Sequence, residues 1–105
     1  MTVKILTLIP ARMESSRFPG KPMAMIAGKP MIGHVYERVA QCDLVTCTAV
    51  ATCNEEIKTY IESIGGTAVM TGNHHERASD RCAEALLALE KARGEKFDIV
   101  VMVQG

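Results

Sequence analysis

The sequence predicts an α/β fold with a parallel sheet, because short apolar runs alternate along the chain with segments of amphipathic helical periodicity. The apolar runs lack polar alternation, which is typical of strands that are covered on both faces. Connections from a strand through a helix to a parallel strand are right-handed in nearly all proteins, so helices are expected on both sides of the sheet. With 105 residues, 48% of them hydrophobic, the chain has enough apolar material for one core.

Four strands are expected, at residues 3–9, 44–51, 67–70 and 97–103. Pro10 ends the first strand, and a connection with neither helical nor strand periodicity runs from Pro10 to Pro22. The first helix is expected to have Pro30 in its first position and to end near Cys42. One face of this helix would carry the apolar residues Met31, Ile32, Val35 and Val39.

Two further helices have start and stop signals in the sequence. Asn54 is a suitable N-cap for the second helix and Gly65 ends it; the apolar positions between them are Ile57, Tyr60, Ile61 and Ile64. Ser79 is expected to cap the third helix, and Gly94 ends it. The apolar positions of the third helix are Cys82, Leu86 and Leu89.

Charge and composition exclude several classes of protein. Twelve basic and twelve acidic side chains give a formal net charge of zero, so no overall field favours nucleic acid or an anionic membrane as a partner. No apolar stretch approaches the ~18 residues of a membrane span, and no signal peptide is evident, so a cytoplasmic protein is expected. The four cysteines lack C-x-x-C spacing, which favours reduced structural residues over a zinc site; they are Cys42, Cys47, Cys53 and Cys82.

The connection from Pro10 to Pro22 is the main candidate for chemistry. Three basic side chains against one acidic side chain give it a net charge of +2; the residues are Arg12, Arg17, Lys21 and Glu14. Ligands of α/β sheets bind beyond the carboxyl ends of the strands, where this connection leaves the first strand. An arginine fork and a mobile lysine charge suit a triphosphate, with hydroxyl donors from Ser15 and Ser16 and close backbone approach at Gly20.

The sequence leaves open that this connection is only a solvated surface loop. It contains neither G-x-x-x-x-G-K-[ST] nor G-x-G-x-x-G, which disfavours a P-loop enzyme and a dinucleotide-dependent enzyme. Two adjacent histidines, His74 and His75, could suggest a metal site, but an adjacent pair needs further ligands supplied by the fold. A solvated turn is the expected role of the two histidines.

Several ordered blocks of residues, spread over essentially the whole chain, have the spacing of one set of known motifs. The first block consists of Ile9-Pro10-Ala11-Arg12, Ser15-Ser16-Arg17 and Pro19-Gly20-Lys21-Pro22. The later blocks are Gly28-Lys29-Pro30-Met31-Ile32, His34-Val35, Glu37-Arg38, Gly65-Gly66, Met70-Thr71, Asp80-Arg81 and Ala83-Glu84. The final Val103-Gln104-Gly105 is similar to the start of a V-Q-G-D-E-P motif. With these blocks the sequence resembles the cytidylyltransferases that activate acidic sugars, and among them the 3-deoxy-manno-octulosonate cytidylyltransferases; several ordered motifs argue against a chance similarity.

The resemblance implies a Rossmann-like parallel sheet of the nucleotide-diphospho-sugar transferase type, incomplete in this chain, with residues 1–105 as the CTP-binding part of a larger α/β domain. The anomeric hydroxyl of a sugar acid would attack the α-phosphate of CTP, with Mg²⁺ as cofactor, and the full-length enzyme would be a homodimer. Arg12 and Lys21 would be catalytic. The nucleotide would be bound by Ala11, Arg12, Ser15, Arg17, Lys21, Ser79, Arg81 and Gln104.

Each role in the pyrimidine pocket has a structural alternative. Ser79 could serve only as a helix cap, Arg81 could be a surface side chain in a first helical turn, and Gln104 could simply end a strand. The chain also departs from the family, which commonly has Ser-Gly-Thr where Arg77-Ala78-Ser79 stand here. This difference leaves the shape of the pocket and the identity of the sugar open.

The chain is expected to be an N-terminal part of an enzyme that is inactive by itself, because the magnesium-binding aspartate of the family would come directly after Gly105. No metal ligand is therefore expected within the 105 residues. One alternative keeps the chemistry and changes the acceptor to an acylneuraminate or another nonulosonate. Another is a stand-alone nucleotide-binding module without catalysis.

Overall fold

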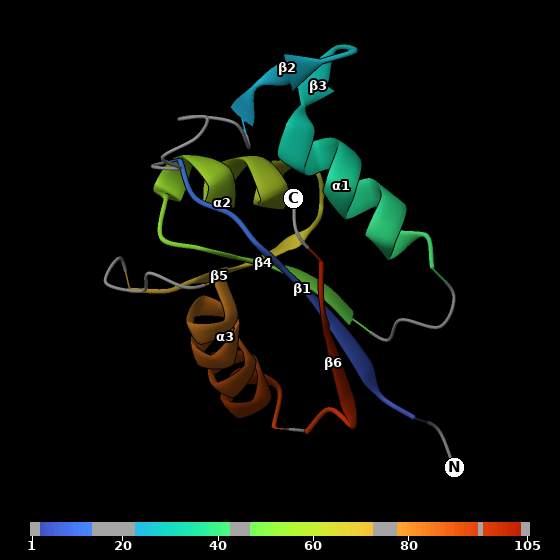
Figure 1. Ribbon diagram of the computed structural model, residues 1–105, viewed down its shortest axis with the longest axis vertical. Coiled ribbons are helices and arrows are strands. Elements are labelled where there is room, and N and C mark those ends of the chain that lie inside the picture. The colour runs from blue at the N-terminus through green and yellow to red at the C-terminus, as the bar shows by residue number, and fades with distance from the viewer. Residues whose placement is uncertain (1–2, 14–22, 43–46, 73–77, 95, 104–105) are drawn as a thin grey trace.

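The computed structural model describes residues 3–13, 23–42, 47–72, 78–94 and 96–103, with the side chains of Ala78 and Ser79 excepted. Four parallel strands form one sheet in the order β5-β4-β1-β6. Their bounds are Ile5–Pro10 for β1, Cys47–Thr52 for β4, Thr67–Met70 for β5 and Ile99–Met102 for β6. The predicted α/β class with a parallel sheet is therefore confirmed (Figure 1).

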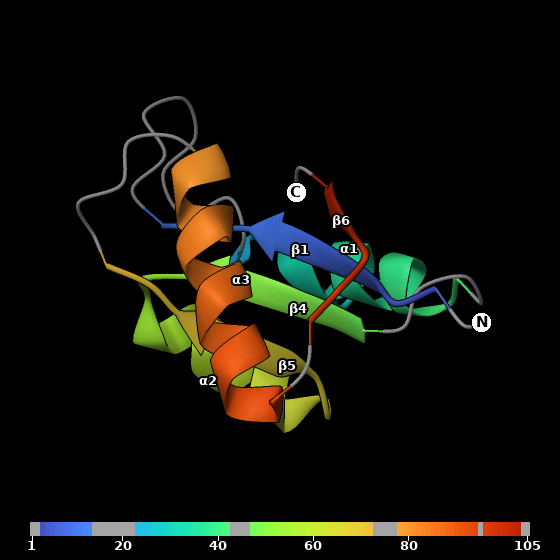
Figure 2. The same cartoon turned by 90° about the horizontal axis from the view of Figure 1, so that it is seen from below.

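Helices cover both faces of the sheet, as the sequence predicts. Helices α1 (Met31–Ala40) and α2 (Glu55–Ser63) lie on one side, and α3 (Ala78–Arg93) lies on the other (Figures 1 and 2). The core is accordingly divided into two clusters. The cluster on the α3 side contains Leu6, Leu8, Ala49, Ala51, Cys82, Ala85 and Leu89. The cluster on the side of α1 and α2 contains Ile9, Ala11, Ile32, Val50, Ile57 and Ile61.

Several boundary predictions need correction. Pro30, predicted in the first position of the first helix, is the N-cap residue of α1 and the last residue of β3, and β1 begins two residues later than predicted and includes Pro10. Helix α3 begins at Ala78, so Ser79 is inside the first turn and the predicted cap position is wrong. Ile64 does not extend the buried face of α2, because it is the C-cap residue, 39% exposed, before Gly65 turns the chain with φ +81°. Strand β4 reaches Thr52, one residue beyond the predicted end, while the predicted strand residues 44–46 lie outside the described residues.

Strand β6 differs from the prediction in burial. Its sequence suggests cover on both faces, yet its four residues are between 40% and 47% exposed; they are Ile99, Val100, Val101 and Met102. Among the described residues, β6 pairs with β1 alone and forms one edge of the sheet. An apolar strand at an edge retains backbone groups and side chains that a further element could cover.

A short hairpin of β2 (Met25–Ile26) and β3 (Lys29–Pro30) precedes α1 and was not predicted. Its turn residues Ala27 and Gly28 both have positive φ, of 50° and 87°, as two-residue hairpin turns require. Strands of two residues are too short for an alternation of polar and apolar residues to be visible. The signal in the sequence was therefore only the glycine of the turn.

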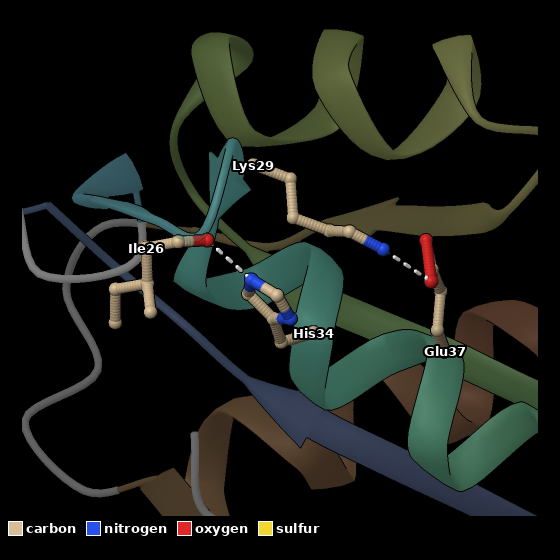
Figure 3. Close-up of polar contacts among 4 residues, drawn as sticks. All are labelled: Ile26, Lys29, His34 and Glu37. Carbon is tan, nitrogen blue, oxygen red and sulfur yellow. Dashed lines mark hydrogen bonds and ion pairs between the residues drawn. The ribbon is translucent and has the colours of Figure 1, made fainter.

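Side chains of α1 and β3 fasten the hairpin to the helix that follows it (Figure 3). Lys29 Nζ lies 2.7 Å from Glu37 Oε2, and the imidazole Nε2 of His34 donates to the carbonyl oxygen of Ile26. Because both partners of the ion pair are about 40% exposed, its contribution to stability is expected to be below about 1 kcal/mol. These contacts show the structural role of Lys29, His34 and Glu37, which belong to the blocks that resemble the family.

Tyr36 joins α1 to the start of two neighbouring strands. Its hydroxyl donates to the carbonyl oxygen of Thr48 at 3.3 Å and accepts from the backbone N–H of Thr67 at 3.2 Å. The ring packs directly against Gly66, where an added Cβ would lie 2.8 Å from Tyr36 Cζ and from Ile61 Cγ2. The two hydrogen bonds hold the ring in place, so it cannot move away from a larger residue.

Gly66→Ala is therefore expected to destabilise the protein by about 1–3 kcal/mol through overpacking. Thermal or denaturant unfolding of the complete protein measures this loss. Thr59→Ala, an exposed substitution on the neighbouring α2, is the matched control and should leave the midpoint close to that of the native protein. Equal midpoints for Gly66→Ala and the control would show that the contact at Gly66 is not tight.

Candidate functional site

The carboxyl ends of the strands meet at one edge of the sheet, and the hydrogen bonds between strands continue there. The N–H of Ala11 donates to the carbonyl oxygen of Ala51 at 3.0 Å, that of Thr71 to Thr52 at 2.9 Å, and that of Val103 to Leu8 at 3.0 Å. The segments that leave β1, β4, β5 and β6 are therefore held side by side. This edge is where ligands bind in open α/β sheets.

Arg12 lies at this edge directly after β1, half-buried. Within the part of the chain that the structure describes, no side chain pairs with its guanidinium. Ala11 is only 8% exposed and its N–H is occupied by the carbonyl oxygen of Ala51. The Ala11 amide is thus used within the sheet.

Arg81 is buried, with 3% of its surface exposed, in the first part of α3. Its Nη1 donates to Thr71 Oγ1 at 3.0 Å, directly after the end of β5. The alternative of a surface side chain in a first helical turn is therefore wrong, because the side chain of Arg81 is buried and donates a hydrogen bond to Thr71. One strand, β4, separates the exits of β1 and β5, so about 10 Å lie between the strands that carry Arg12 and Thr71.

A second contact holds the start of the segment after β5. The backbone N–H of Gly72 donates to the carboxylate of Glu84, at 3.3 Å from Oε1 and 3.1 Å from Oε2. Together with the bond between Arg81 and Thr71, it ties the exit of β5 to α3. Thr71 and Glu84 belong to two of the blocks that resemble the family, but only the fold shows that Thr71 contacts Arg81 and that Glu84 contacts Gly72.

Several predicted site residues lie outside the described residues. They are Ser15, Arg17, Lys21 and Gln104, together with His74 and His75 of the predicted turn. Ser79 belongs to the first turn of α3, and its side chain is likewise not described. The structure therefore places Arg12 and Arg81 at one edge, while the binding roles of these and of the other site residues stay predictions.

Asn54 is the residue at this edge whose role the sequence reading missed. It is the N-cap residue of α2, as predicted, but its side chain makes no capping hydrogen bond. Its Oδ1 instead accepts from the backbone N–H of Met13 at 3.0 Å, across 41 positions of sequence. A local capping signal gives no indication of such a long-range contact.

The cysteines and acidic side chains show no metal centre among the described residues. No group of three or more histidine, cysteine, aspartate or glutamate residues in that part of the chain is arranged to hold a metal ion. The four cysteines are free thiols. Burial raises the pKa of the Cys82 thiol, against a smaller lowering by Arg81, so the thiol stays protonated as a structural residue would.

The helices of the described segments contain none that is both long enough and apolar enough to cross a membrane. The edge described above brings together the half-buried Arg12, the buried Arg81 and backbone groups at the ends of parallel strands. This arrangement is that of an open α/β protein with cationic side chains at the edge of the sheet where ligands usually bind.

The sequence of the chain matches the family model for cytidylyltransferases over residues 6–105, so the chain belongs to the cytidylyltransferase family. It is 54% identical over 104 residues to a 3-deoxy-manno-octulosonate cytidylyltransferase of Brucella anthropi, covering 99% of this chain and 41% of that protein. It is 49% identical to the enzyme of the same name from Syntrophus aciditrophicus, covering 97% of this chain and 40% of the relative.

A related name also occurs among the similar proteins. An 8-amino-3,8-dideoxy-manno-octulosonate cytidylyltransferase of Shewanella amazonensis is 48% identical over 103 residues, covering 98% of this chain and 41% of its own. The fold resembles a solved structure of CMP:2-keto-3-deoxy-manno-octonic acid synthetase complexed with CTP, with a TM-score of 0.83 and 42% identity over 96% of this chain and 39% of that one. The chain thus spans about 40% of the length of the relatives that it matches.

Proposed function

We propose that the complete protein transfers CMP from CTP to 3-deoxy-D-manno-octulosonate, giving CMP-octulosonate and pyrophosphate for lipopolysaccharide synthesis. The observation that supports this most strongly is the 42% identity and TM-score of 0.83 to a synthetase solved with CTP. Identities of about one half to octulosonate cytidylyltransferases favour this acceptor over an acylneuraminate. Membership of a family of transferases favours an enzyme over a stand-alone binding module.

In the proposed reaction the anomeric hydroxyl oxygen forms a bond to the α-phosphorus of CTP. The bond from that phosphorus to the bridging oxygen breaks, pyrophosphate leaves, and the hydroxyl proton is lost. Both substrates are anions, so cationic side chains lower the electrostatic cost of bringing them together. Arg12 occupies the described part of the edge where the triphosphate would lie, and Ser15, Arg17 and Lys21 are proposed to complete this role.

The base and ribose are proposed to lie at the carboxyl ends of the strands, with Arg81, Ser79 and Gln104 lining the pyrimidine pocket. The bond from Arg81 to Thr71 holds the guanidinium at the exit of β5, and a guanidinium is a group that reads a pyrimidine edge by donating hydrogen bonds. Burial of Arg81 means that such a ligand would have to enter between the ends of the strands. The exits of β1 and β5 are about 10 Å apart, which is the distance that the nucleotide would span between Arg12 and Arg81.

We further propose that the complete protein needs Mg²⁺, acts as a homodimer and works in the cytoplasm. The described residues do not form a set of metal ligands, so the metal would be held by residues outside them. The 105-residue chain by itself is proposed to bind CTP weakly without turnover, because it spans only about 40% of the length of its relatives. Added EDTA should abolish turnover by the complete protein, and excess Mg²⁺ should restore it.

An assay of acceptor choice tests the proposed function. Pyrophosphate release is measured for the complete protein with CTP, Mg²⁺ and each of four acceptors: the octulosonate, its 8-amino analogue, an acylneuraminate and no sugar. The 8-amino analogue is included because a relative of that name is 48% identical. Turnover is expected with the octulosonate. Faster turnover with another sugar would reassign the acceptor, and no turnover with any sugar acid would refute the function.

A further inference from the structure

We propose that Asn54 is a positioning residue for Arg12, an inference that rests on the proposed use of Arg12 to bind the triphosphate. The backbone N–H of Met13 donates to Asn54 Oδ1 at 3.0 Å. The nitrogen of Met13 belongs to the peptide bond that joins it to Arg12. The contact therefore fixes the direction of the chain immediately after the arginine.

Asn54 is itself held by the end of β4. Its backbone N–H donates at 3.1 Å to Oγ1 of Thr52, which is fully buried, and its carbonyl oxygen accepts the first helical bond from Lys58 at 3.2 Å. Its backbone is extended, with φ −109° and ψ 121°, as at other N-cap positions. The side chain therefore projects from a fixed base, the junction of β4 and α2.

The carboxamide of Asn54 is not used in the way usual for its position. An asparagine at an N-cap normally accepts from an amide of its own helix, and this one makes no side-chain capping bond. Its acceptor is directed to the segment after β1 instead. Replacing the side chain is thus expected to act on that segment more than on the stability of α2.

The chain is also held on the other side of Arg12. The N–H of Ala11 donates to the carbonyl oxygen of Ala51, and Ala11 is buried in the cluster on the side of α1 and α2. Met13 packs against the same cluster. Both neighbours of Arg12 are therefore fixed to β4 or to its junction with α2, while the arginine side chain remains half-exposed at the edge.

This arrangement suits a residue that must meet a ligand in a set geometry. A side chain whose backbone is held beforehand loses less entropy on binding, and small displacements of a binding group cost large factors in rate. Asn54 would thus act through Arg12, without touching the nucleotide.

Hydrogen–deuterium exchange of the complete protein tests the structural part, independently of any activity. In Asn54→Ala, the segment with the Met13 amide is expected to exchange about five- to tenfold faster, because a hydrogen bond is lost. Asn54→Asp keeps an acceptor oxygen and the N-cap residue type, so its exchange should stay near that of the native protein. Unchanged exchange in Asn54→Ala would overturn the proposal.

A double-mutant cycle tests the functional part. Asn54→Ala is expected to lower kcat/KM for CTP roughly tenfold in the native background and less than about twofold in an Arg12→Ala background. Thr59→Ala on α2 should have no effect in either background. Equal losses in the two backgrounds would show that Asn54 does not act through Arg12. No turnover by the native protein would refute the proposed function. The exchange experiment would then still decide whether the side chain of Asn54 holds the backbone amide of Met13.

Discussion

Arg12→Ala is expected to lower kcat/KM for CTP by roughly 10²–10³-fold in the complete protein, because it removes a positioned cation from the edge where charge develops on the phosphates. The structure supports a large effect, since both neighbours of Arg12 in the chain are held in place and no described side chain pairs with its guanidinium. Steady-state kinetics with CTP varied at saturating sugar acid measures the loss.

Two matched variants separate geometry from charge. Arg12→Lys keeps the positive charge and loses the planar fork, so an intermediate loss of about tenfold is expected. Arg38→Ala removes an exposed arginine of α1, away from the strand ends, and should leave kcat/KM unchanged. If Arg12→Ala behaved like Arg38→Ala, Arg12 would have no part in binding or transfer.

The 105-residue chain, prepared by itself, is expected to associate with itself through β6. Four consecutive apolar residues of this strand are at least 40% exposed, and the strand forms an edge of the described sheet. Such an edge combines unpaired backbone groups with apolar surface, which favours pairing with another chain. Sedimentation or size-exclusion chromatography with light scattering should therefore give a mass above that of one chain, rising with concentration.

A lysine on this edge provides the corresponding variant. Val101→Lys is expected to shift the chain towards the monomer, because charged side chains on an edge strand oppose pairing. Thr59→Lys adds the same charge on α2 and should leave the association unchanged. A native chain that stays monomeric at all concentrations would contradict the prediction. Equal association of both lysine variants would place the contact elsewhere.

Elements with strong local signals were predictable from the sequence. For α2, an N-cap asparagine, a glycine stop and apolar residues at helical spacing predict the helix, and Ile57 and Ile61 are fully buried in its core face. Strand β5 has the predicted bounds, Thr67–Met70. In α2 and β5 the local preference of the sequence agrees with the packing of the fold, so the local sequence is sufficient to predict the secondary structure.

Features that depend on contacts between distant segments were not predictable. The two-residue strands of the hairpin are too short to show periodicity, and the exposure of β6 depends on which elements lie beside it. At the site, the predicted cap Asn54 accepts from Met13, and the predicted pocket residue Arg81 is buried against Thr71. A residue type and its position in a helix identify a donor or acceptor, whereas the fold decides its partner.

The central claim, transfer at the α-phosphate of CTP, is tested most directly by following labelled phosphates. The complete protein is incubated with the octulosonate, Mg²⁺ and CTP labelled either at the α- or at the γ-phosphate. The account predicts that the α-label appears in a CMP-sugar and that the γ-label leaves as pyrophosphate, in equal amounts. Release of the γ-label as inorganic phosphate in the absence of pyrophosphatase, or no sugar-linked α-label, would contradict it.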